Sequence, residues 1–296
     1  MTNPPARLYL ALTYMVAMGA IWGLQFSTAK IGRAHGIPPS AWVFWMGVSG
    51  AAVLLAISAA RGGRPWVLAG EWRYAIVAGA TAVAIPNTIM ALVVGHVPAG
   101  IAALLNTLSP LMTYAIALGL RMDALHRLRV AGLGFGFAGA VLVLGPRASL
   151  PDPAMWPWVA LCLWVPFFYA ASNIYIGRFR PPGAESIGLG GAMQAGAVAS
   201  VLPLALVDGF YVPLPPAHPG DWALLAQASI NWIGSLVFFE VMRLAGPVFF
   251  SQTGFLVTLC GVFWGWLLFG ETHSAYVWAA MAAIFAGLAL VTRAGR

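Results

Sequence analysis

The sequence alternates between long apolar stretches and short polar breaks. A helix needs about 20 apolar residues to cross the hydrocarbon core of a bilayer. Stretches of this kind occupy residues 8–32, 40–60, 72–94, 98–120, 128–145, 156–177, 186–207, 222–243, 247–268 and 274–292. The pattern therefore predicts an all-α membrane protein with ten transmembrane helices. Breaks as short as His96–Pro98 and Ala245–Pro247 predict that successive helices are antiparallel neighbours.

The basic residues test this helix count, because Lys and Arg gather on the cytoplasmic side of membrane proteins. If ten helices alternate across the membrane, twelve of the 15 basic residues lie on the side of both termini. The other side holds Lys30, Arg33 and Arg147. The asymmetry predicts that both termini are cytoplasmic and that the chain is a multi-pass protein of an inner (plasma) membrane.

Composition supports the same class. Hydrophobic residues make up 61% of the 296 residues and charged residues only 8%, against roughly 25% charged in a soluble domain. The net charge of +7 is scattered singly along the chain, so a nucleic-acid partner is not expected. Cys162 and Cys260 lie in apolar runs and indicate neither a disulfide nor a zinc site. The first apolar run is too long for a signal-peptide core, so we expect no cleavable signal peptide.

Short matches between the halves indicate an internal repeat. Ile31–Arg33 matches Ile176–Arg178, and Phe137–Gly139 matches Phe285–Gly287, in the same order along each half. Five helices are an odd number, so a second copy enters the membrane from the opposite side. The predicted domains are therefore two inverted five-helix repeats, residues 1–148 and 149–296. In such a fold the substrate site lies near mid-membrane between the repeats.

Several motifs resemble the EamA-type drug/metabolite transporter superfamily, and the likeness covers nearly the whole chain. Ile21–Phe26 followed by Lys30 resembles its helix 1 signature. Leu108–Pro110 and the glycine-rich stretch Gly132–Gly145 resemble its helix 4–5 region. Phe269–Glu271, before the small-residue last helix, resembles the same region in the second half.

This resemblance implies a membrane transporter of small molecules. By general similarity the chain looks most like the bacterial amino-acid exporters, particularly the aromatic amino acid exporters. It departs from the family pattern at Asp123, which is the counterpart of Glu271 but is not part of a Gly-Glu pair.

Polar side chains near mid-membrane are candidates for a substrate site, because polar groups in hydrocarbon are costly. We expect the following to face one central cavity: Trp22, Gln25, Asn87, Asn106 and Asn231, with Trp164, Trp232 and Ser251 as weaker members. Their amides and hydroxyls would hydrogen-bond the ammonium and carboxylate of a zwitterion, and their rings would bury an apolar side chain. The alternative is that the amides hold helices together by hydrogen bonds.

Prolines lie near several of these positions. Pro86 precedes Asn87, Pro110 follows Ser109, and Pro166 lies near the middle of its predicted helix. Proline removes a backbone donor and bends a helix, which predicts breaks that either line a cavity or serve packing alone. Small residues at every fourth position, as in Gly188, Ala192, Gly196 and Ser200, are interpreted as scaffold.

The positions of the charged residues limit the classes of substrate that are expected. The first predicted helix contains no acid at its centre, and every Lys and Arg lies near a helix end. Cationic drugs and phosphorylated substrates are therefore disfavoured. Glu240 lies three residues before Arg243, which predicts an interfacial ion pair or, alternatively, a proton-coupling site. No His, Cys, Asp or Glu cluster has catalytic or metal-ligand spacing, so neither enzyme activity nor a cofactor is expected.

The predicted function is a secondary transporter, an exporter of small neutral or zwitterionic metabolites such as amino acids, including aromatic ones. Alternating access around the central cavity would be its mechanism. The partners expected are a small-molecule substrate and the lipid bilayer. A passive channel for small metabolites and an exporter of drug-like compounds stay open as alternatives.

Overall fold

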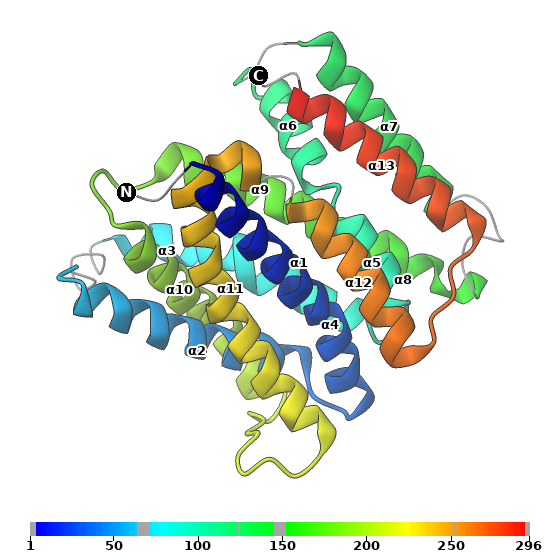
Figure 1. Cartoon of the computed structure of the whole chain (residues 1–296). Coiled ribbons are helices and arrows are strands. Elements are labelled where there is room, and N and C mark those ends of the chain that lie inside the picture. The colour runs from blue at the N-terminus through cyan, green and yellow to red at the C-terminus, as the bar shows by residue number, and fades with distance from the viewer. Residues whose placement is uncertain (1–3, 64–70, 123–124, 145–151, 251–252, 294–296) are drawn as a thin grey trace.

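The computed structural model describes residues 4–63, 71–122, 125–144, 152–250 and 253–293, and every regular element in this part is helical (Figure 1). The elements are α1 (Pro4–Ala34), α2 (Pro39–Ala60), α3 (Trp72–Gly79), the π-helix η2 (Ala80–Ala84), α4 (Ile85–Val93), α5 (Ala99–Asn106), α6 (Ser109–Gly119), α7 (Arg127–Leu144), the 3-10 helix η3 (Pro153–Met155), α8 (Trp156–Cys162), α9 (Trp164–Phe179), α10 (Ser186–Val207), α11 (Pro219–Phe250), α12 (Thr253–Phe269) and α13 (Ala275–Arg293). Each predicted span contains a helix or an interrupted helix.

Three helical segments are interrupted, and each interruption precedes a proline. The π-helix η2 comes before Pro86, the gap between α5 and α6 before Pro110, and the gap between α8 and α9 before Pro166. Proline lacks an N–H and clashes with the carbonyl four residues earlier, which disrupts the helix at that point. The predicted breaks are therefore confirmed. Pro203 lies inside α10 without interrupting it, so proline alone does not decide the outcome.

The predicted break at Ala245–Pro247 is wrong. α11 continues through these residues to Phe250 and is 32 residues long. Gly246 and Pro247 both disfavour helix locally, but a membrane helix tolerates such residues where neighbouring groups satisfy the freed carbonyl. The predicted start of the next span, residue 247, therefore belongs to the end of α11, and α12 begins at Thr253.

Helices that are distant in the sequence pack side by side. α2 runs along α10, α1 lies against both α11 and α12, and α7 pairs with α13 at the edge of the bundle (Figure 1). α3 and α10 approach so closely that a Cβ on Gly196 would lie 2.0 Å from the carbonyl oxygen of Ala75. Gly196, one of the small residues in this stripe, is thus packed against another backbone, as the scaffold interpretation predicts.

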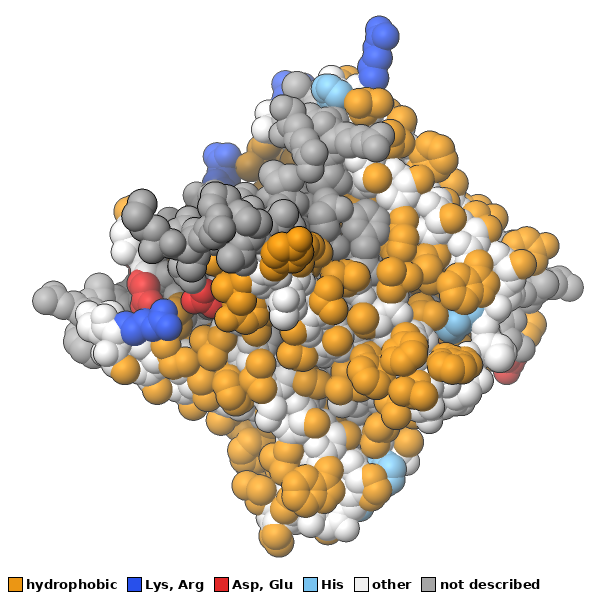
Figure 2. All heavy atoms as spheres, viewed as in Figure 1, with side chains coloured by type: hydrophobic (Ala, Val, Ile, Leu, Met, Phe, Trp, Pro, Cys, Tyr) orange, Lys and Arg blue, Asp and Glu red, His pale blue; other side chains and the backbone are white. Residues whose placement is uncertain are grey.

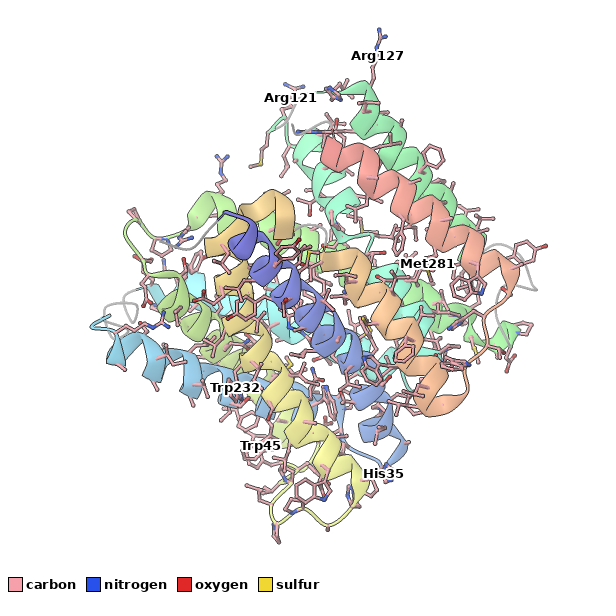
Figure 3. The ribbon with its side chains drawn as sticks, in the orientation of Figure 1. His35, Trp45, Arg121, Arg127, Trp232 and Met281 are labelled. Carbon is pink, nitrogen blue, oxygen red and sulfur yellow. The ribbon has the colours of Figure 1, made fainter. Side chains whose placement is uncertain are left out.

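The surface of the bundle has the composition of a membrane protein. Within the described residues, five helical segments are long and apolar enough to cross a membrane, namely Pro39–Ala60, Trp72–Val93, Ala99–Gly119, Pro153–Phe179 and Ser186–Val207. Two shorter helical stretches, in α12 and α13, are also apolar. Figure 2 shows hydrophobic side chains over the middle of one face, with charged groups towards its edges. Arg121 and Arg127 lie at one end of the bundle and His35 at the opposite end (Figure 3).

Candidate functional site

A pocket of about 300 Å³, here called the chamber, lies between α1, the α5–α6 gap, α9 and the start of α12. Its walls combine neutral polar groups with aromatic rings. The residues that line it are Trp22, Gln25, Asn106, Thr107, Ser109, Pro110, Tyr169, Thr253, Gly254, Val257 and Leu288. None of these described lining residues is Asp, Glu, Lys or Arg.

The α5–α6 gap positions the polar wall of the chamber. Asn106 is the last residue of α5 and Ser109 the first of α6, so the gap turns both side chains into the same region. The hydroxyl of Thr107 donates to the carbonyl of Leu104 at 2.5 Å, within the last turn of α5. A broken helix with polar side chains at its ends is the feature that forms substrate sites in many transporters.

Two buried polar atoms of the chamber lack a hydrogen-bond partner among the described residues. They are Oδ1 of Asn106 and Oγ1 of Thr253. Buried polar atoms in native proteins are nearly always paired with protein, water or ligand. An unpaired buried polar atom is unfavourable, so a movement of the wall that brings either atom to a polar group in the chamber would be favoured.

A second pocket of about 530 Å³, here called the vestibule, adjoins the chamber at Trp22, which lines both pockets. Its polar lining includes Asn173, Arg180, Ser186, Gln194 and Ser235. The guanidinium of Arg180 donates to the carbonyl of Ala184 and to the hydroxyl of Ser186, at 3.0 and 2.9 Å. These residues lie at the start of α10, the end that the predicted topology places in the cytoplasm.

Asn231 and Asn87 line neither pocket, but each contacts a residue that does. The amide of Asn231 donates to the carbonyl of Met46 at 3.0 Å and accepts from Nε2 of Gln194 at 3.2 Å. It therefore joins α11 to α2 and supports Gln194, which lines the vestibule. Asn87 donates to the carbonyl of Val83 at 2.8 Å and lies within hydrogen-bonding reach of Tyr169, a lining residue of the chamber.

The three weaker candidates do not line the chamber or the vestibule in the described part of the chain. Trp164 is 53% exposed and packs edge-on against Phe167. Trp232 is partly buried in α11 and appears beside α2 in Figure 3. Ser251 lies outside the described residues. Of the predicted set, the structure thus brings Trp22, Gln25 and Asn106 together in one pocket.

Sequence reasoning missed Tyr169, Thr253 and Gln194. Gln194 lies between small residues of α10 that are typical of scaffold, and its Oε1 is buried without a partner among the described residues. An isolated amide inside a small-residue stripe was the available signal for this position. Tyr169 and Thr253 gave no comparable signal, because each is common in membrane helices.

An ion pair joins the two halves of the chain at the end opposite to the vestibule. Lys30 near the end of α1 pairs with Glu271, in the turn between α12 and α13. The same carboxylate accepts from the backbone N–H of Ala99 at 2.8 Å and of Gly100 at 3.2 Å. A negative charge at a helix N-terminus is favourable, and Gly270, with φ of 63°, turns the chain so that Glu271 reaches α5.

Two further predictions concern acidic residues. Glu240 is partly buried in α11, while the side chain of Arg243 lies outside the described part, so the predicted pair stays a prediction. Asp123, the predicted counterpart of Glu271, also lies outside the described residues. Within the described chain, no group of three or more His, Cys, Asp or Glu residues could hold a metal ion.

A third pocket, of about 560 Å³, is lined by apolar residues of α6, α7 and α8, among them Leu111, Phe137 and Trp156. Phe137 and Trp156 are exposed, which places this pocket on the outer surface of the bundle. Its described lining carries no side-chain amide, hydroxyl or charged group, in contrast to that of the chamber.

Comparisons with known proteins agree with this architecture. A solved structure titled "Crystal structure of protein" is similar with a TM-score of 0.63 and 20% sequence identity, over 97% of this chain and 99% of that chain. At this identity the likeness shows the fold alone, and it spans both halves. No curated protein matches the chain. The model of the EamA-like transporter family matches residues 9–145, and this match supports a membrane transporter of small molecules from the drug/metabolite transporter superfamily.

Proposed function

We propose that the chain is a secondary transporter that exports small neutral or zwitterionic metabolites, namely amino acids that include aromatic ones, across the bacterial inner membrane. The chamber is its substrate site. The observation that carries this proposal is the pair of buried, unpartnered polar atoms in the chamber wall, on Asn106 and Thr253. A bound zwitterion would provide partners for both.

The lining supports a substrate without net charge. Gln25, Asn106 and Thr253 offer amide and hydroxyl groups, which can donate to a carboxylate or accept from an ammonium. Each such bond contributes roughly 0.5–1.5 kcal/mol. Trp22 and Tyr169 provide aromatic surface for an apolar or aromatic side chain. A pocket of about 300 Å³ lies at the small end of ligand sites, which run from roughly 300 to 1,000 Å³, and this fits a single amino acid.

Alternating access requires a closure on each side that opens in turn. The Lys30–Glu271 pair, with the N-terminus of α5, supplies the outer closure in this proposal. It joins helices of the predicted first repeat to the α12–α13 turn of the predicted second repeat, so relative movement of the repeats would break it. The vestibule, at the opposite end, is the route to the cytoplasm.

Uptake of labelled amino acids into proteoliposomes tests the proposal. We expect saturable uptake, competition between aromatic amino acids, and a loss of uptake in the Asn106→Ala variant at equal folded protein. Flux that rises linearly with concentration and shows no competition would identify a passive channel instead. Saturable flux of drug-like cations without amino-acid flux would show that the substrate class is wrong.

A further inference from the structure

Trp22 occupies the boundary between the vestibule and the chamber. Its indole lines both pockets, and the other described lining residues belong to one pocket or the other. A direct path from the vestibule to the chamber therefore runs past this residue. The position of the ring decides whether the two pockets communicate.

Gly234 on α11 provides the space in which the ring sits. A Cβ on Gly234 would lie 1.9 Å from Nε1 of Trp22, 2.7 Å from Cδ1 and 2.9 Å from Cε2. These distances are far below van der Waals contact, so any other residue at this position forces the indole to move. α1 and α11 pack along each other, and Gly234 is buried in that contact.

Gly234 differs in this respect from Gly196 and Gly79, two glycines at close helix–helix contacts. A Cβ on Gly196 would first meet the backbone of Ala75, and one on Gly79 would first meet the backbone of Met193 and Ala197. Those two glycines let helices approach. At Gly234 the three nearest atoms all belong to the indole of Trp22, so this glycine accommodates a side chain.

We propose that Trp22 is a movable partition between the vestibule and the chamber, and that Gly234 is the positioning residue that seats it. This inference rests on the proposed transport function and assigns the passage of substrate to one ring. Substrates that pass must displace the indole, so Gly234 influences which side chains are carried without touching the substrate itself.

A double-mutant cycle tests the assignment, because two residues that act through one contact are not additive. We expect Gly234→Ala to slow amino-acid transport by about tenfold or more, the factor that about 1.4 kcal/mol represents. In the Trp22→Ala background the same change should have no further effect. Gly134→Ala is the matched control, since a Cβ there meets nothing within 4 Å, and it should leave transport unchanged. Equal losses from Gly234→Ala in both backgrounds would overturn the proposal.

The same variants also provide a control for loss of folding. If Gly234→Ala alone gives no folded protein, removal of the indole should restore folding in the Trp22→Ala/Gly234→Ala variant, as judged by size-exclusion chromatography. A double variant that also fails to fold would show that Gly234 acts elsewhere, and the proposal would be wrong.

A measurement without substrate separates this inference from the transport function. Ser109→Cys places a thiol in the chamber, in a background where Cys162 and Cys260 are replaced by Ala. A thiol reagent added from the vestibule side should label it about tenfold faster when Trp22 is Ala. Unchanged labelling would refute the partition even if amino acids are transported. Faster labelling with no transport of any amino acid would support the partition and count against the proposed function alone.

Discussion

Lys30 and Glu271 are 241 positions apart in the sequence and form an ion pair where α1, the N-terminus of α5 and the α12–α13 turn meet. The carboxylate is only 5% exposed, whereas the lysine side chain is 27% exposed. The pair therefore closes the packed end of the bundle while the ammonium retains contact with water. Three elements depend on one side chain at this point.

Replacement of Glu271 by Gln should destabilise this junction. The change removes the charge opposite Lys30 and leaves one backbone N–H of α5 without an acceptor, at a cost of about 1–3 kcal/mol. We expect a lower Tm in detergent and faster labelling of a chamber thiol from the outer side. Glu71→Gln is the control, because Glu71 is exposed and makes no capping bond with its side chain. Equal Tm values for Glu271→Gln and wild type would contradict the closure.

The amides of the chamber and the amide behind it should behave differently. Gln25→Ala and Asn106→Ala each remove a group that lines the chamber, so we expect transport to fall by about tenfold, as about 1.4 kcal/mol implies, at unchanged Tm. Asn231→Ala removes bonds to Met46 and Gln194 and should also lower Tm. Initial rates per folded protein and thermal denaturation distinguish the two outcomes. A Tm loss in all three variants would favour helix–helix contacts over a binding role.

Acidic pH should weaken the protein through His273, in the turn after α12. Burial lowers the pKa of His273 below its ordinary value of 6.5, the carboxylate of Glu271 acts in the opposite direction, and Lys30 lowers it further. The unfolded chain therefore binds a proton more readily, so stability present above pH 6.5 is lost as the pH falls through the folded-state pKa. When the pH is lowered from about 7.5 to about 5.5, the Tm of the His273→Asn variant should fall less than that of wild type. The exposed His126→Asn variant should follow wild type.

Reporter fusions test the orientation. A reporter after Arg296 should be active in the cytoplasm, and one in the loop near Pro216 should be active in the periplasm. The expectation rests on the asymmetry of basic residues. Activity of both reporters on the same side of the membrane would disprove the ten-helix topology.

The helices could be predicted because their signals are local. The length of each apolar stretch predicts a span, and the chemistry of proline predicts the interruptions before Pro86, Pro110 and Pro166. Neither prediction needs information on tertiary contacts. Pro247 shows the limit of this argument, because neighbouring groups can satisfy the carbonyl that a proline frees. Whether a proline breaks a helix then depends on contacts that the local sequence does not contain.

The site could be predicted only in part. Depth in the membrane grouped Trp22, Gln25 and Asn106, which line one pocket, since helices that cross the same bilayer place their midpoints at one level. Depth does not give the direction in which a side chain faces, so Asn231 was expected in the cavity but lies behind Gln194. The Lys30–Glu271 pair was also missed, because it depends on how α1 packs against the last turn of the second half.

The uncharged lining of the chamber has an electrical consequence. A membrane potential acts on a carrier by about 2.3 kcal/mol per elementary charge per 100 mV. If neither the described chamber wall nor a zwitterionic substrate bears net charge, reorientation moves no charge through the field at this site. Any voltage dependence of transport would then report the charge of the ions that are carried together with the substrate. Current recorded per molecule transported would thereby measure the energy coupling of the protein directly.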